Sequence, residues 1–231
     1  MLITELAVLK WAHILAMVYW LGGEWGVFQT SYNVVNRKLA MDERKRHMET
    51  AYRIDILART GILLLFPLGF HMGKFWGVHL WAGGQQSLID LAIVLCWIFF
   101  GLWLVLCWAA FVYRETDRGI RLTRIDESIR FVFIPVTLLA SISSLLGHGP
   151  FLGEPGWFAA KILVFSLLLI IGLKLRFIMR EWTHMFRLLA QKEDAEVENT
   201  LERSIRIGRN LAYVYWVGIA TVAFLGATKP F

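Results

Sequence analysis

Residues 11–26, WAHILAMVYWLGGEWG, place a histidine and a carboxylate in a segment that is otherwise apolar. His13 and Glu24 are eleven residues apart, which is about three helical turns. At about 100° per residue, the two side chains lie within about 20° of one helix face. Ionisable groups inside a membrane span are costly, so they indicate a functional role. An imidazole can bind a metal, and a buried carboxylate can carry a proton or pair with a cation.

Three further histidines are expected in the same half of the protein as His13. His71 ends the second apolar segment, His148 ends the fourth, and His79 lies in the loop after the second. Imidazoles from different helices at one depth favour haem b, because axial ligands reach the iron from either face of the macrocycle. The sequence therefore predicts bis-histidine ligation of a haem by His13 and either His71 or His148.

Copper is the other metal that this pattern favours. Met17 lies one helical turn from His13, and Met72 follows His71 directly. Thioether sulfurs are soft ligands that suit Cu(I). The copper site would then consist of His13, Met17, His71, Met72 and His79.

Charged residues complete the candidate site. Lys161 lies near the outer end of the fifth apolar segment, where it could neutralise a haem propionate or extend toward the lipid headgroups. Glu24 lies deeper, and Arg59 is its candidate partner, which leaves two interpretations open: a proton relay and a structural ion pair. Arg59 also follows Asp55 by four residues, a spacing that predicts an ion pair along one helix. We assign no catalytic residue from the sequence.

Six apolar segments must position these residues. About 20 apolar residues cover the hydrocarbon core of a bilayer. The chain is 57% hydrophobic with a mean hydropathy of +0.55, which exceeds the apolar content of soluble domains. The sequence predicts an all-α polytopic membrane helix bundle forming a single domain over residues 1–231. Its spans are expected at about 6–30, 51–72, 90–113, 131–152, 157–177 and 210–228.

Lysine and arginine are concentrated in the loops after the first, third and fifth segments. The positive-inside rule then predicts that these loops are cytoplasmic and that both termini face the outer, periplasmic side. A bacterial inner membrane is the location that this topology implies. The formal net charge of +6 reflects the same asymmetry, so we expect no nucleic-acid partner.

The stretch KWAHILAMVYWLGG, residues 10–23, resembles the first helix of HemJ-type protoporphyrinogen oxidases and of CopD copper-resistance membrane proteins. Both families begin with a Lys-x-x-His element followed by an aliphatic run, Trp and Gly. Residues 134–164 resemble the Pro-containing second helix of HemJ, its loop and its Trp-x-x-x-Lys element, here Trp157 and Lys161. The final KPF also ends many HemJ-type chains. The resemblance implies a b-type haem bound through His13, although HemJ-type proteins have four spans where six are predicted here.

These observations predict an integral membrane b-type haem protein that transfers electrons with a quinol, a quinone or a redox partner protein. A HemJ-like oxidation of a porphyrinogen is a variant of the same prediction, so the chain could be an oxidoreductase subunit. A CopD-like copper-binding or uptake protein is one alternative. A structural membrane subunit of a larger redox complex is another, and a homo-oligomer is compatible with each.

Overall fold

The computed structural model describes residues 4–78, 85–151, 156–191 and 194–230. These residues form six long α-helices, and each is long and apolar enough to cross a membrane. A short 3-10 turn, η1 (Lys74–Trp76), follows the second helix. The helices are α1 (Glu5–Val34), α2 (Met41–Gly73), α3 (Gln86–Val112), α4 (Asp117–Leu145), α5 (Gly156–Gln191) and α6 (Ala195–Thr228). The predicted all-α bundle of a multi-pass membrane protein is confirmed.

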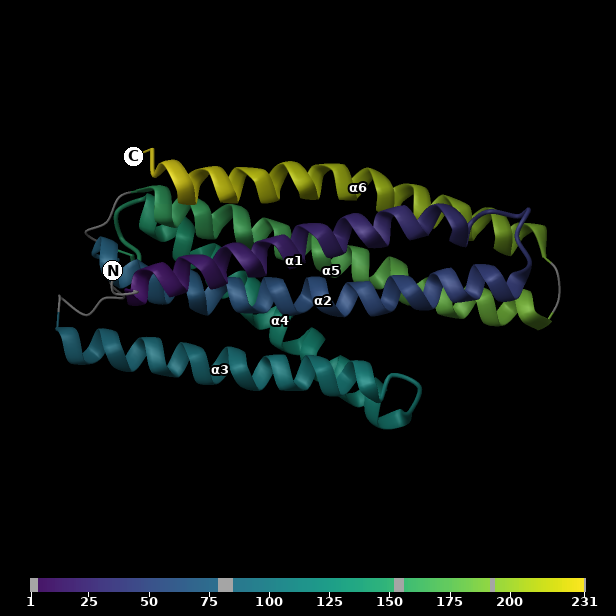
Figure 1. Ribbon diagram of the computed structural model, residues 1–231, viewed down its shortest axis with the longest axis horizontal. Helices are drawn as coiled ribbons and strands as arrows, with labels where there is room; N and C mark the ends of the chain where they lie inside the picture. Colours follow the sequence, from purple (N-terminus) through teal and green to yellow (C-terminus); the bar gives the residue numbers. More distant parts are fainter. Residues whose placement is uncertain (1–3, 79–84, 152–155, 192–193, 231) are drawn as a thin grey trace.

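Both chain termini lie at one end of the bundle, which we call the terminal end (Figure 1). At the opposite end, α1, α2, α5 and α6 extend beyond the turn that joins α3 to α4 (Figure 1). The two ends are therefore built differently, because α3 and α4 do not extend to the end that is opposite the termini (Figure 1). Which end faces the periplasm stays a prediction.

Several helices continue outside the predicted apolar spans. α2 begins at Met41 where the span was expected to begin near residue 51, α5 continues to Gln191, and α6 begins at Ala195. These extensions form a second apolar core around Met48, Trp182 and Leu201. Charged residues on the outside of the extensions lower the hydropathy without breaking the helices, so a hydropathy-based prediction ends too early.

α4 ends earlier than the predicted span, which was expected to continue to residue 152. Gly147 adopts a left-handed conformation with φ of 82°. The amide of Gly147 donates to the Ser144 carbonyl, and the amide of His148 donates to the Ser143 carbonyl. This pair of hydrogen bonds is the Schellman motif, which terminates a helix at a left-handed glycine. His148 consequently lies beyond the helix.

α1 and α2 pack at very short range. A Cβ atom on Gly61 of α2 would overlap the backbone of Ala16 and Trp20 on α1. One helical turn further along α1, a Cβ atom on Gly23 would overlap Ala58 of α2. Glycine is required at these positions because the two backbones approach too closely for a side chain. The contact sets the position of His13 and Glu24 on α1 relative to α2.

Candidate functional site

A cavity of about 830 Å³, here called the terminal cavity, lies in the terminal half of the bundle between all six helices. Its volume is within the range of small-molecule and cofactor sites, which is about 300–1,000 Å³. Its walls are largely apolar and aromatic, and they include Trp20, Phe66, Phe100, Phe133 and Phe165. Its polar lining residues include Lys10, His13, Lys161 and Lys229. The cavity therefore suits a ligand with a large apolar body and a negatively charged group.

His13 reaches this cavity from α1. Its Nδ1 atom is buried and has no hydrogen-bond partner within the described residues. Gly69 of α2 faces the ring, since a Cβ atom there would lie 3.2 Å from Cε1 of His13. Buried polar atoms are nearly always hydrogen-bonded, so an exception needs an explanation. A ligand that binds the imidazole would provide one.

His71 is engaged elsewhere. Its Nδ1 accepts a hydrogen bond from Nε1 of Trp97 at 3.3 Å, and its Nε2 lies 2.9 Å from Oε1 of Glu5. Lys74 contacts the same carboxylate oxygen at 2.9 Å. Both ring nitrogens thus have partners, and His71 does not line the terminal cavity. In this structure it belongs to a polar cluster at the terminal end.

The remaining predicted ligands are divided between the cavity and the surface. His148 is exposed and does not line the cavity, and His79 lies outside the described residues. Met17 and Met72 do line the cavity together with His13. The structure therefore does not bring together the predicted pair of haem histidines, whereas it does bring together a histidine, two methionines and Lys161.

Lys10 and Lys229 were not among the predicted site residues, yet both line the cavity at its tryptophan-rich end. Their Nζ atoms lie 5.6 Å and 3.9 Å from the centre of the Trp76 ring. Lys229 also lies 6.0 Å from the Trp157 ring. Partial burial and the nearby Lys10 lower the pKa of Lys229. The signal in the sequence is that each lysine stands at the terminal end of a span, close to tryptophans that are typical of membrane interfaces.

Lys161 adds a third positive charge from α5. It packs closely against Gly226 of α6, where an added Cβ atom would overlap its Nζ. Among the described residues, no aspartate or glutamate lines the terminal cavity. The lysines therefore give the cavity a positive potential without an internal counter-charge.

Comparisons with protein-family models, with curated proteins and with solved structures find no match to this chain. The resemblance to HemJ and CopD proteins therefore stays a prediction. Evidence on the chemistry of the site comes from its own geometry.

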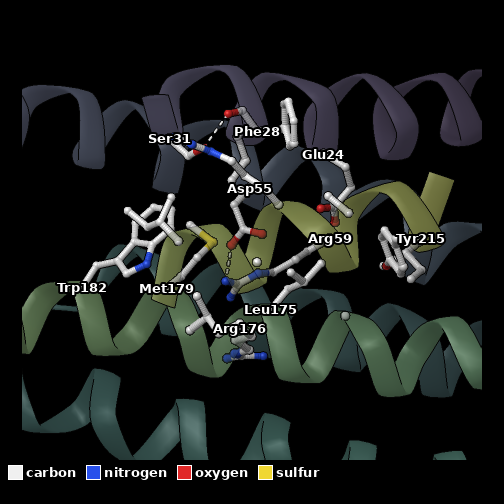
Figure 2. Close-up of a pocket in the computed structure, with 18 of the residues that line it drawn as sticks. Glu24, Phe28, Ser31, Asp55, Arg59, Leu175, Arg176, Met179, Trp182 and Tyr215 are labelled. Carbon is white, nitrogen blue, oxygen red and sulfur yellow. Dashed lines mark hydrogen bonds and ion pairs between the residues drawn. The ribbon is translucent and has the colours of Figure 1, made fainter. Parts of the chain in front are cut away.

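A second cavity, of about 80 Å³ and here called the polar chamber, lies further from the terminal end (Figure 2). It is lined from α1, α2, α4, α5 and α6. Its charged lining residues are Glu24, Asp55, Arg59, Arg130, Arg176 and Arg209. Such a concentration of charge at membrane depth indicates a structural network, a functional site or both.

Most of these charges have partners. Arg59 pairs with Asp55, as the i, i+4 spacing predicts, and not with Glu24 (Figure 2). Arg130 and Arg176 both pair with Asp126, which is fully buried and also accepts a hydrogen bond of 2.7 Å from Nε1 of Trp103. The ion pair considered for Glu24 and Arg59 is thus not formed.

Trp20 and Tyr215 form the wall between the two cavities. Trp20 lines the terminal cavity, and Tyr215 lines the polar chamber. Nε1 of Trp20 donates a hydrogen bond of 3.1 Å to the Tyr215 hydroxyl, and the two rings meet edge to face. Each residue is only 1% exposed. The wall is therefore closely packed and leaves the two cavities separate.

Proposed function

We propose that this protein is an integral membrane b-type haem protein that transfers electrons, with the haem in the terminal cavity and His13 as an axial ligand. The observation that carries the proposal is an unpartnered imidazole in a large apolar cavity that is rich in lysine. Haem b has an apolar macrocycle, an iron that binds imidazole, and two propionate carboxylates. The aromatic walls, His13 and the lysines match these three parts.

Residues that line the terminal cavity would bind the haem, orient it and exclude water from it. Trp20, Phe100 and Phe165 exclude water from the cavity, which tunes the potential of a bound redox centre. Lys161, together with Lys10 and Lys229, neutralises carboxylates and so sets the orientation of the macrocycle. When bound, the haem supplies one-electron chemistry.

A second protein ligand to the haem would come from another helix. Met72 of α2 lines the cavity and offers a neutral sulfur, and a His–Met pair gives a higher potential than two histidines. Bis-histidine ligation with His71 or His148 would require that side chain to leave its present position. Met72 is therefore the second ligand that the cavity supports best.

The physiological setting is part of the proposal. Electrons would be exchanged with a quinone or a redox partner protein, or with a porphyrinogen if the HemJ resemblance extends to activity. The protein would lie in a bacterial inner membrane with both termini in the periplasm, as the distribution of basic loops predicts. Six spans with exposed apolar faces are compatible with a complex subunit or a homo-oligomer.

Copper is the second candidate because His13, Met17 and Met72 share one cavity. One nitrogen and two thioether donors suit Cu(I). Two observations favour haem instead: the lysines repel a cation, and the cavity is far larger than a single ion requires. Met17→Leu separates the two functions, since it weakens binding of Cu(I) and leaves a haem spectrum unchanged.

The test is an absorption spectrum of the detergent-purified protein from cells well supplied with haem, before and after reduction with dithionite. We expect a Soret band and a sharp α-band in the wild type, loss of both in His13→Ala, and retention of both in His148→Ala. His148 is the matched control because it is exposed and outside the cavity. A wild type without visible bands, or full haem content in His13→Ala, would refute the proposal.

A further inference from the structure

Glu24 lines the polar chamber and forms no ion pair within the described residues. We propose that Glu24 is a proton-binding group that takes up one proton when one electron enters the terminal cavity. The coupling rests on the proposed haem function, whereas proton binding by Glu24 can be tested without it.

The first support is the pairing pattern of the chamber (Figure 2). The groups that face Glu24 across it are Asp55 and Arg59 on α2, Arg130 on α4, Arg176 on α5, and Arg209 and Tyr215 on α6. Most of these charged groups have an ion-pair partner: Asp55 and Arg59 pair with each other, and Asp126 pairs with Arg130 and Arg176. Arg209 donates through Nε to the Ser31 hydroxyl, and its Nη2 has no hydrogen-bond partner within the described residues. Within the described residues, Glu24 makes no hydrogen bond and no ion pair. Its carboxyl group is thus free to change its protonation state without breaking a contact.

The second support is the balance of charge. An ionised Glu24 would be the fourth carboxylate of the network, with Asp55, Asp126 and Glu127, against the guanidinium groups of Arg59, Arg130, Arg176 and Arg209. Burial in an apolar bundle favours a neutral carboxyl group, whereas the guanidinium groups favour a carboxylate. Because these two effects oppose each other, both protonation states can be reached.

The third support is access to water from one side only. The chamber volume of about 80 Å³ exceeds the roughly 10–15 Å³ that one water molecule needs. The side chains of Asp55 and Arg59 keep 13% and 21% of their accessible area, so the chamber is not sealed. Trp20 and Tyr215 close the side toward the terminal cavity. A proton on Glu24 therefore exchanges through the open side and does not pass to the terminal cavity.

The coupling to the terminal cavity is electrostatic. His13 and Glu24 lie on the same helix, and eleven residues at a rise of about 1.5 Å separate them by about 16 Å along its axis. Charges at this distance interact inside a bundle because its interior screens them less than water does. One electron from a quinol or another donor adds one negative charge at the cavity, and one proton on Glu24 cancels it. The net charge of the bundle is unchanged.

The first experiment needs no haem. Infrared spectra of the purified protein are recorded in H₂O and D₂O from mildly acidic to mildly alkaline pH. We expect a neutral-carboxyl C=O band that titrates, shifts in D₂O, and is absent in Glu24→Gln. It should remain in Glu202→Gln, a matched control because Glu202 pairs with Arg37 and neither residue lines the chamber. Persistence of the band in Glu24→Gln, or no such band in the wild type, would overturn the assignment.

The second experiment is a redox titration of the haem at several pH values. Reduction takes up a proton, so the wild-type midpoint potential should fall as the pH rises. We expect this slope to disappear in Glu24→Gln and to remain in Glu202→Gln and in Glu24→Asp, which keeps a carboxyl group. An equal slope in Glu24→Gln would refute the coupling while leaving the haem function intact. If no haem is bound, the proposed function and the coupling fail together, and the infrared result alone decides proton binding by Glu24.

Discussion

The terminal cavity and the polar chamber are separated by one hydrogen-bonded pair of aromatic residues, Trp20 and Tyr215. The two cavities differ in whether their charged lining residues have partners of opposite charge. The terminal cavity, at about 830 Å³, has lysines and a buried imidazole but no carboxylate among its described lining residues. The chamber, at about 80 Å³, has six charged lining residues, and four of them form ion pairs. A large site that lacks counter-charges needs a ligand to supply them, whereas a small site supplies most of them through its own ion pairs.

The difference also shows which polar groups carry information about function. Arg130 and Arg176 are costly at membrane depth, but each forms an ion pair with Asp126 that offsets part of this cost. Within the described residues, Nδ1 of His13 in the cavity has no hydrogen-bond partner, and Glu24 in the chamber has no ion-pair partner. An unmatched buried group is therefore the more informative observation, even where paired charges are more numerous.

The largest effect is expected where the chamber pairs its charges. Asp126→Asn removes the carboxylate shared by two arginines and leaves both guanidinium groups without it. Breaking a buried ion pair from one side costs about 3–5 kcal/mol, so the free energy of unfolding should fall by at least about 3 kcal/mol. The measurement is denaturant unfolding in detergent.

Asp117→Asn is the matched control on the same helix, because Asp117 is exposed in the first turn of α4. Its effect should stay below about 1 kcal/mol. Equal losses in the two variants would show that the chamber is not held together by Asp126, which would remove the contrast between the two cavities.

A smaller effect is expected at the wall between the cavities. Gly61→Ala places a methyl group against the backbone of Ala16 and Trp20. Overpacking of this kind costs about 1–3 kcal/mol and should separate α1 from α2, so that haem content falls together with thermal stability. Gly101→Ala is the control, since nothing lies within 4 Å of its added Cβ atom, and it should be neutral or stabilising. A Gly61→Ala variant as stable as the wild type would contradict the close approach.

The smallest effect is expected at Lys229, at the tryptophan-rich end of the terminal cavity. Lys229→Met removes one positive charge from a partly exposed position, so affinity for an anionic cofactor should fall by about 1 kcal/mol, roughly fivefold in Kd. Because the pKa of Lys229 is lowered, the wild type should approach the variant as the pH rises through that pKa and the ammonium loses its charge. Haem titration into the apoprotein measures both. Lys174→Met, an exposed lysine outside the cavity, should leave Kd unchanged; an equal effect there would mean that only net charge matters.

Local sequence patterns were sufficient for the architecture and for part of the site. Six apolar stretches of about 20 residues predict six spans because burial in lipid depends on composition within each stretch. The Asp55–Arg59 ion pair follows from i, i+4 spacing alone and is confirmed. His13 and Lys161 could be singled out because a polar residue in an apolar span is visible without knowledge of its neighbours.

The partners of those residues depend on helices that are distant in the sequence. His71 contacts Glu5 of α1 and accepts a hydrogen bond from Trp97 of α3. The hydropathy of the segment around His71 does not indicate either contact. His148 is placed outside the bundle by a left-handed glycine that ends α4 early. Lys10 and Lys229 become one site only because both ends of the chain return to the same end of the bundle (Figure 1).

Apolar composition and helical spacing thus decide which segments cross the membrane and which of them carry unusual polar groups, since both properties are local. Packing decides which of those groups find a partner, because an ion pair or hydrogen bond needs two atoms within about 3–4 Å on helices that the sequence does not align. Packing pairs Asp126 with its arginines, whereas among the described residues it provides no hydrogen-bond partner for Nδ1 of His13 and no ion pair for Glu24, which makes these two groups the candidates for function.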